Sequence, residues 1–135
     1  MAGVKGLKGL RHVAIRVRDI RCSKAFYQQC FGMEVVWEPD AENVYLSSGP
    51  DNIALHQLPE GAAPSEQQQL DHIGFIVETA ERVKQLEAEF QQKGTRIVHS
   101  FKVHRDGSAS FYCADPDGII IQLLYEPTLS RQQLR

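Results

Sequence analysis

The sequence lacks several features that would assign a function directly. Its 135 residues contain no glycine-rich phosphate loop, no nucleophile elbow and no HExxH zinc-protease motif. No segment approaches the length of a transmembrane helix, and residues 1–10, with three Gly and two Lys, lack the apolar centre of a signal peptide. We therefore expect a cytoplasmic protein that does not span a membrane.

The small net charge and the few cysteines argue against some classes of protein. The formal net charge is −2, so the sequence carries no basic footprint for nucleic acid or an anionic membrane. The three cysteines, Cys22, Cys30 and Cys113, are an odd number and none has the paired spacing of a zinc site. Free cysteines of this kind suit a reducing compartment, where they behave as small apolar residues.

What the sequence does contain is one pattern that occurs twice. Residues 10–17 and 70–77 each place a His at the start of an alternating apolar run, with a tiny residue, Ala14 or Gly74, two positions later. Side chains alternate between the faces of a strand, so each His shares a face with that tiny residue. In the first run Arg16 lies on the same face.

A helix pattern follows each of these strands. The first helix is expected over 20–31, with Asp19 as its cap, Gly32 at its end and a buried stripe of Cys22, Phe26 and Cys30. The second is expected to run from its cap at Thr79 to about Lys93 and to end at Gly94. Its expected buried stripe is Val83, Leu86 and Phe90, and Glu89 and Lys93 form an expected ion pair. Further strands are expected over 33–37, 43–47, 52–58, 95–98, 108–114 and 118–125.

The order β-α-β-β-β thus occurs twice, which predicts an α+β fold. We expect one domain over 1–135, with a first module at 10–58, a linker at 59–69, a second module at 70–125 and a fraying tail from Glu126. Two copies of such a module must close on each other to bury a core. Two equivalent sheets placed edge to edge would form a curved cup.

The repeat also predicts a metal site. When the copies are aligned through their fourth strands, residues 54–58 lie over residues 120–124 and His56 matches Gln122. The candidate metal ligands are then His12, His56, His72 and Gln122. Neutral imidazoles suit Zn, Ni, Fe, Co or Cu, and a Gln carbonyl oxygen can complete the shell. The alternative is that each His is a half-buried, hydrogen-bonded strand residue that was inherited with the repeat.

Other polar residues are candidates for substrate binding. Arg16 should point the same way as His12, unless it is a strand cation that extends into solvent. Three residues before the seventh strand could hold a carboxylate or phosphate, or simply be solvated: Lys102, His104 and Arg105. His99 has no counterpart in the repeat and is interpreted as structural or solvated. Trp37 and Tyr45 are either core residues or aromatic residues of the cup.

Four motifs together resemble the vicinal oxygen chelate superfamily, over nearly the whole chain. They lie at residues 12–17, 26–34, 71–77 and 111–118. The superfamily contains glyoxalase I, bleomycin-resistance proteins, fosfomycin-resistance transferases, extradiol dioxygenases and methylmalonyl-CoA epimerase. The resemblance implies paired βαβββ modules forming a cup, metal ligands from the first and fourth strand of each module, and a divalent transition metal such as Zn, Ni, Fe, Co or Mn. It also implies a small-molecule substrate and a homodimer, whose cup lies within one chain or is shared between two.

The sequence departs from this family at two ligand positions. Gln122 stands where the last strand usually gives Glu, and His56 stands where enzymes similar to glyoxalase I usually have Glu. A shell of three His and one Gln has no carboxylate to shuttle a proton, nor the two-His-one-carboxylate set that dioxygenases resemble. A metal could still chelate and polarise an oxygen ligand.

Three hypotheses follow from this reading of the sequence. The favoured one is a metal-dependent enzyme, lyase-like or dioxygenase-like, that acts on a small oxygen-chelating substrate. The alternative is a non-catalytic binding protein of the bleomycin-resistance type. The third is a structural or regulatory relic of the fold that binds neither metal nor ligand.

Overall fold

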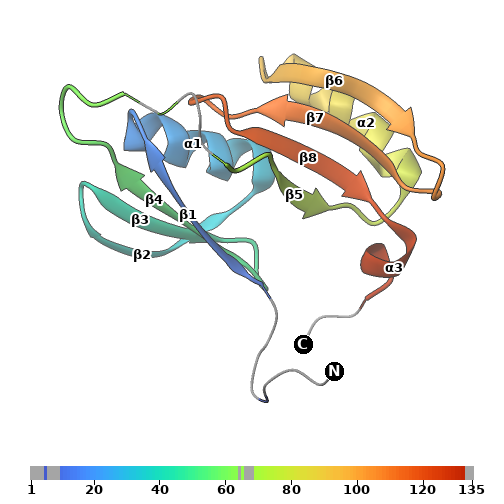
Figure 1. The fold of residues 1–135 in the computed structure, drawn as a ribbon, viewed down its shortest axis with the longest axis horizontal. Coiled ribbons are helices and arrows are strands. Elements are labelled where there is room, and N and C mark those ends of the chain that lie inside the picture. Colours follow the sequence, from blue (N-terminus) through green and yellow to red (C-terminus); the bar gives the residue numbers. More distant parts are fainter. Residues whose placement is uncertain (1–4, 6–9, 64, 66–68, 133–135) are drawn as a thin grey trace. The chain divides into compact units, whose positions relative to one another are not determined.

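The chain folds into two compact units, Met1–Ala62 and Ala63–Arg135. The computed structural model describes residues 5, 10–63, 65 and 69–132. Each unit combines one long helix with one four-stranded sheet (Figure 1). The boundary between the units falls within the expected linker at 59–69, of which residues 64 and 66–68 lie outside the described residues. Residues 1–4 and 6–9 also lie outside the described residues.

The first unit has the predicted order of one strand, one helix and three strands. Its elements are β1 (His12–Val17), α1 (Ile20–Phe31), β2 (Glu34–Asp40), β3 (Asn43–Ser47) and β4 (Asn52–Gln57). The sheet order is β1-β4-β3-β2, with β1 parallel to β4 and the other neighbours antiparallel. The first and last strands of the module therefore lie side by side.

The second unit repeats this topology. Its elements are β5 (Ile73–Ile76), α2 (Ala80–Gln92), β6 (Arg96–Val103), β7 (Ala109–Ala114), β8 (Ile120–Tyr125) and the short α3 (Pro127–Ser130). The sheet order is β5-β8-β7-β6, with β5 parallel to β8. The predicted α+β class and the two βαβββ modules are confirmed. No helix among the described residues is long and apolar enough to cross a membrane.

The helix boundaries follow from side chains that satisfy free backbone groups. The Asp19 carboxylate accepts hydrogen bonds from the backbone N–H groups of Arg21 and Cys22, and the Thr79 hydroxyl accepts one from Arg82 N–H. Gly32 ends α1 in the left-handed conformation, φ +63°, which a residue without a Cβ adopts at little cost. These caps are the ones that the sequence predicts.

The buried face of α1 differs from the predicted one. Its buried residues are Ile20, Ser23 and Tyr27, whereas Cys22 is exposed and Cys30 only half-buried. Both sets have helical spacing, so periodicity alone does not choose between two faces about 100° apart. Tyr27 lies on the face that is buried, and the complete burial of its ring removes a large apolar area from water.

In α2 the apolar stripe is mostly as predicted, but the ion pair is different. Val83 and Phe90 are buried, and the Phe90 ring packs edge-on against Phe111 of β7 at 5.7 Å between centroids. Glu89 pairs with Arg82 at 2.6 Å instead of with Lys93. The Arg82 hydrogen bond and charge hold the pKa of the Glu89 carboxyl below its ordinary value.

The end of the second unit is more ordered than the sequence predicts. β6 extends to Val103, and residues 127–130 form α3 instead of a fraying tail. The Glu126 carboxylate caps α3 by accepting hydrogen bonds from Thr128 and Leu129 N–H, and it also accepts one from the Thr128 hydroxyl. The hydroxyl bond first, and then the backbone bonds, lower the pKa of Glu126. The Ser130 hydroxyl donates to the Val77 carbonyl at 2.8 Å, which ties the helix to the end of β5. A single helical turn has too few residues to show periodicity.

Candidate metal and substrate site

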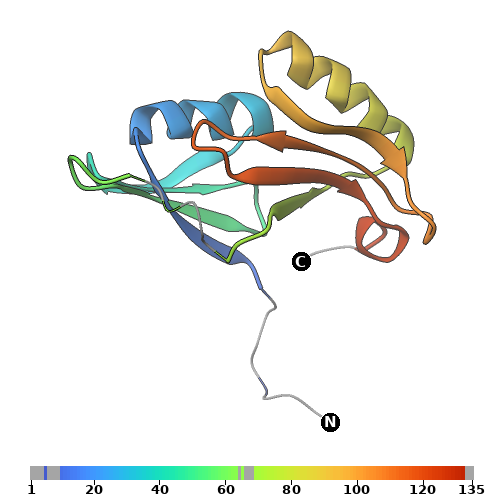
Figure 2. The same ribbon diagram turned by 45° about the horizontal axis from the view of Figure 1, so that its top comes forward.

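The face of the first sheet opposite α1, called here the first open face, carries the polar residues expected there. Helix α1 covers one face of the first sheet (Figure 2). Along β1, Ile15 and Val17 are buried, and the alternation of a strand directs His12, Ala14 and Arg16 to the opposite face. The β1–β4 register places three pairs on the first open face: His12 opposite Asn52, Ala14 opposite Ala54, and Arg16 opposite His56.

His12 is held in one tautomer by its strand neighbour. Its Nδ1 lies 2.7 Å from the Asn52 Oδ1 oxygen. Because an amide oxygen only accepts hydrogen bonds, Nδ1 carries the proton and Nε2 keeps its lone pair. A metal-binding His typically has an outer acceptor on its other nitrogen in this way. His12 is exposed, so Nε2 is accessible.

His56 is oriented by a chain of two polar residues. Its Nδ1 donates to the Asn43 Oδ1 oxygen at 2.7 Å, and the Asn43 amide group donates to the Asp40 Oδ1 oxygen at 2.9 Å. Hydrogen bonds from Glu42 N–H and from Asn43 hold the pKa of Asp40 below its ordinary value, so it remains a carboxylate. The His56 Nε2 atom is therefore a lone-pair acceptor as well.

Two aromatic side chains complete the first open face. Tyr45 of β3 lies opposite Ala54 of β4, and Trp37 of β2 lies opposite Tyr45. Their rings meet edge-on at 4.9 Å between centroids, and the Tyr45 ring lies 5.9 Å from the His12 ring and 6.5 Å from the His56 ring. These aromatics are surface residues of the predicted polar face, since Trp37 is 53% exposed.

The corresponding face of the second sheet, the second open face, holds the other two predicted metal ligands. Gly74 of β5 lies opposite Gln122 of β8, and Gln122 lies opposite Tyr112 of β7. His72 precedes β5, and its Nδ1 lies 2.6 Å from the Asp71 carboxylate, so in the neutral imidazole the proton is on Nδ1 and Nε2 has the lone pair. The His72 side chain is 33% exposed.

The Gln122 carboxamide lies close to Gly74. A Cβ at Gly74 would lie 4.0 Å from the Gln122 Oε1 atom, so this carboxamide extends over the glycine. Within the part of the chain that the structure describes, no hydrogen bond to the Gln122 carboxamide is found. The amide oxygen is therefore available on the same sheet face as Gly74.

The strand registers overturn the alignment that matches His56 with Gln122. In the first sheet Ala14 lies opposite Ala54, and in the second Gly74 lies opposite Gln122. The equivalent of Gln122 is therefore Ala54, and His56 lies two positions further along its strand. Sequence gives no fixed point in these apolar strands, and a shift of two residues keeps every side chain on its predicted face.

The other predicted substrate-binding residues all belong to the β6–β7 hairpin. Lys102 lies opposite Ser110 and is exposed, and its ammonium group has no partner among the described residues. His104 Nε2 lies 3.0 Å from the Ser110 hydroxyl, and Arg105 is exposed in the turn that follows. His99, interpreted from sequence as structural, lies opposite Tyr112 with its ring 5.5 Å away, on the same face as Gln122.

Sequence reasoning missed the acceptors that orient the histidines. They are Asn52, Asn43 and Asp71, each bonded to the Nδ1 atom of one candidate His. Asp71 is adjacent to His72 in the sequence and was detectable there, whereas the two asparagines lie on other strands. Among the described residues, no cluster of three or more His, Cys, Asp or Glu side chains could hold a metal ion.

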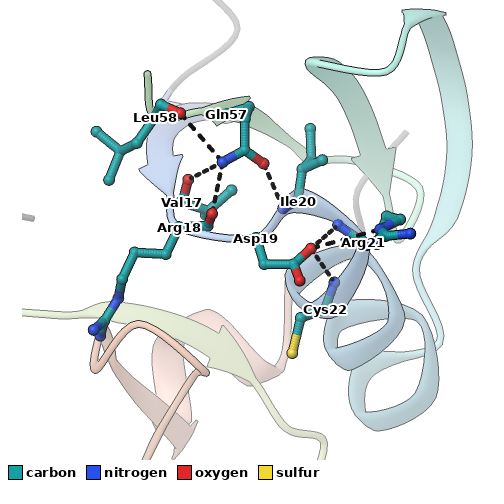
Figure 3. Close-up of polar contacts among 8 residues, drawn as sticks. All are labelled: Val17, Arg18, Asp19, Ile20, Arg21, Cys22, Gln57 and Leu58. Atoms are coloured by element: carbon teal, nitrogen blue, oxygen red, sulfur yellow. Dashed lines mark hydrogen bonds and ion pairs between the residues drawn. The ribbon is translucent and has the colours of Figure 1, made fainter. Parts of the chain in front are cut away.

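A separate polar network lies where β1, β4 and α1 meet (Figure 3). The Gln57 carboxamide donates to the carbonyls of Arg18 at 2.6 Å, Leu58 at 3.2 Å and Val17 at 3.3 Å, and accepts from Ile20 N–H at 2.9 Å. It therefore fixes the start of α1 relative to the two parallel strands. An open cavity of about 680 Å³ adjoins it and is lined by Arg18, Glu42 and residues 57–62.

Curated relatives are distant and carry two different activities in their names. The chain is 28% identical over 120 residues to the "Putative lactoylglutathione lyase" of Brassica oleracea var. gemmifera, with 84% of this chain and 43% of the relative aligned. It spans less than half the length of that protein. It is also 28% identical over 120 residues to the "Glutathione transferase FosA" of Serratia marcescens, with 87% of this chain and 80% of the relative aligned.

The fold and the family agree with these relatives. The crystal structure of lactoylglutathione lyase from Agrobacterium tumefaciens matches with a TM-score of 0.72 at 19% identity, over 90% of this chain and 96% of that one, which supports the fold. The sequence profile of one superfamily matches residues 9–123. The chain belongs to the Glyoxalase/Bleomycin resistance protein/Dioxygenase superfamily.

Proposed function

We propose that the protein is a metal-dependent enzyme that acts on a small oxygen-chelating substrate, with lyase-like or dioxygenase-like chemistry. One observation carries the proposal: the Nδ1 atoms of His12 and His72 are each held by an oxygen acceptor, so both Nε2 atoms are ready to bind a metal. Superfamily membership and the two named relatives support it.

The proposed ligands are His12, His72 and Gln122. Two neutral imidazoles and an amide oxygen form a donor set that Zn, Ni, Fe, Co or Mn accepts. When bound, such a metal supplies Lewis acidity toward a chelating oxygen pair. His56, the fourth ligand expected from sequence, is not equivalent to Gln122 in strand register, so we assign it another role below.

Because Gln122 does not take up a proton at neutral pH, the ligand set itself contains no proton acceptor. In a lyase-like reaction a side chain outside the metal shell must then accept the proton. Dioxygenase-like chemistry does not need a metal ligand to accept a proton. For that chemistry, however, the proposed ligand set lacks the usual carboxylate. The metal that the protein selects decides which assay applies: nickel or zinc favours hemithioacetals, and iron favours dioxygenase substrates.

The experiment that tests the proposal is elemental analysis of protein purified without a His-tag or chelator. We expect about one transition-metal ion per functional site, either as purified or after incubation with each metal followed by dialysis. A protein that stays empty after incubation with all of Zn, Ni, Fe, Co and Mn would contradict the proposal.

The outer acceptors give a graded prediction. Asp71→Ala and Asn52→Ala should each weaken metal binding by about 10–100-fold, because they release a His ring whose tautomer and orientation they now fix. Competition with a chromogenic chelator measures the dissociation constant. Asp51→Ala is a matched control, since that carboxylate bonds Ser48 and no candidate ligand. Unchanged affinity in both acceptor variants would show that these contacts are packing alone.

The second candidate function is sequestration of a small molecule without chemistry. The observation that favours it is the paired Trp37 and Tyr45 rings beside the polar residues of the first open face. It requires tight ligand capture by metal-free protein, which calorimetric screening of metal-free protein against small oxygenated compounds would detect.

We further propose that the protein is a homodimer in a reducing, cytoplasmic compartment, in which Cys22, Cys30 and Cys113 remain free. If two chains share a site, one supplies His12 and the other His72 and Gln122. Dilution should then release metal in step with dissociation. Sedimentation velocity with simultaneous metal analysis tests this, and a metal-loaded monomer would exclude a shared site.

A further inference from the structure

We propose that Arg16 and His56 on the first open face recognise an oxyanion and a neighbouring hydroxyl group of one ligand, as found together in a 2-hydroxy acid. The two residues lie directly opposite each other on the parallel strands β1 and β4, with side chains on the same sheet face. This inference deepens the proposed function by naming the chemical class that the same face binds.

The guanidinium of Arg16 is free to bind an anion. Arg16 is exposed, and among the described residues it makes no ion pair and no hydrogen bond. A free guanidinium presents five N–H donors in a planar fork, which matches the two oxygens of a carboxylate or phosphonate. Two other cations of the same unit are already paired: Lys24 contacts Glu38 at 2.8 Å, and Arg21 contacts Asp19 at 3.9 Å.

His56 supplies the opposite chemistry, an oriented acceptor. The Asp40–Asn43 chain fixes the proton on Nδ1, so in the neutral imidazole Nε2 accepts a hydrogen bond and does not donate one. A donor in the ligand has to meet it. A hydroxyl group next to the oxyanion meets this need, because adjacent residues on β1 and β4 hold the donor fork and the acceptor side by side.

The rest of the face suits a compact ligand. Between the Arg16–His56 pair and the His12–Asn52 pair lie Ala14, which is exposed, and Ala54, which is completely buried, so of the two only the small Ala14 side chain offers surface to a ligand. Tyr45 lies opposite Ala54 and faces the His56 ring edge-on. The half-buried Tyr45 ring and the small Ala14 side chain on this face favour a ligand with a small apolar part.

Tryptophan fluorescence provides a direct test, because Trp37 is the only tryptophan of the chain and its ring contacts Tyr45 on this face. Protein stripped with EDTA and then dialysed is titrated with lactate, with propionate, and with the pair hydroxymethylphosphonate and methylphosphonate. We expect each hydroxylated anion to bind about fivefold more tightly than its partner without the hydroxyl.

Two variants separate the two roles. Arg16→Gln should weaken the binding of both lactate and propionate about tenfold, because both depend on the charged fork. His56→Leu should leave propionate binding within about twofold and abolish the preference for lactate. Arg21→Gln, which removes a positive charge from α1, is the control and should change neither.

Two outcomes would overturn the inference: equal binding of lactate and propionate to the wild type, or a preference for lactate that survives His56→Leu. The titration contains no metal, so its failure is distinct from a failure of the proposed metal site. A loss of metal from His56→Leu in elemental analysis would instead return His56 to the metal shell and would also contradict the inference.

Discussion

Replacement of His72 by alanine is expected to empty the metal site, from about one ion per site to less than about one tenth under the same purification. Loss of one of two imidazoles leaves a single imidazole and an amide oxygen, which is too weak a set to hold a divalent metal through dialysis. His12→Ala should have the same effect. Elemental analysis of tag-free protein measures both.

His104→Ala is the matched control for this experiment. His104 belongs to the same unit as His72, but its Nε2 atom is engaged by the Ser110 hydroxyl at 3.0 Å, so its removal should leave the metal content unchanged. Retention of the metal by both His72→Ala and His12→Ala would contradict the assignment of these two residues as ligands. Circular dichroism of the variants confirms that any metal loss is not loss of fold.

Gln57→Leu is expected to lower the free energy of unfolding of the first unit by about 2–4 kcal/mol. The substitution keeps the approximate shape of the side chain but removes one carboxamide that serves β1, β4 and α1 together. Ile20 N–H at the start of α1 loses its acceptor, and three carbonyls lose a donor. Urea denaturation followed by Trp37 fluorescence reports on this unit, because that tryptophan lies on β2.

Gln29→Leu on α1 controls for the loss of one amide from the same unit. Gln29 is exposed, and no hydrogen bond of its carboxamide is found within the described residues, so the expected change is within about 0.5 kcal/mol. If Gln57→Leu were equally mild, water would replace the carboxamide bonds and the network would not fix the start of α1. We expect Gln57→Leu to leave the metal content unchanged, because the Gln57 carboxamide bonds backbone groups of residues 17, 18, 20 and 58 and no candidate ligand.

The sequence determined the elements and the faces of this protein because those depend on local chemistry. Alternation in residues 12–17 predicts which side chains of β1 are buried, and Asp19, Thr79 and Gly32 mark helix ends through bonds within a few residues. The repeat of β-α-β-β-β and the family motifs were sufficient for the fold class. His12 and His72 stand out for the same reason, as the same residue at the same place in both copies.

Tertiary structure decided what depends on the pairing of distant strands. The registers of β1 with β4 and of β5 with β8 show that Ala54, and not His56, is the equivalent of Gln122. A shift of two residues leaves the apolar pattern intact, so no local signal fixes it.

The same limit explains the partners of the histidines and the buried side of α1. Asn52 reaches His12, and Asn43 reaches His56, from a neighbouring strand. In α1 the sheet buries Tyr27 instead of Cys22, a choice between two helical faces that both have the right spacing. Local chemistry thus fixed which groups this protein has, and long-range pairing fixed which of them meet.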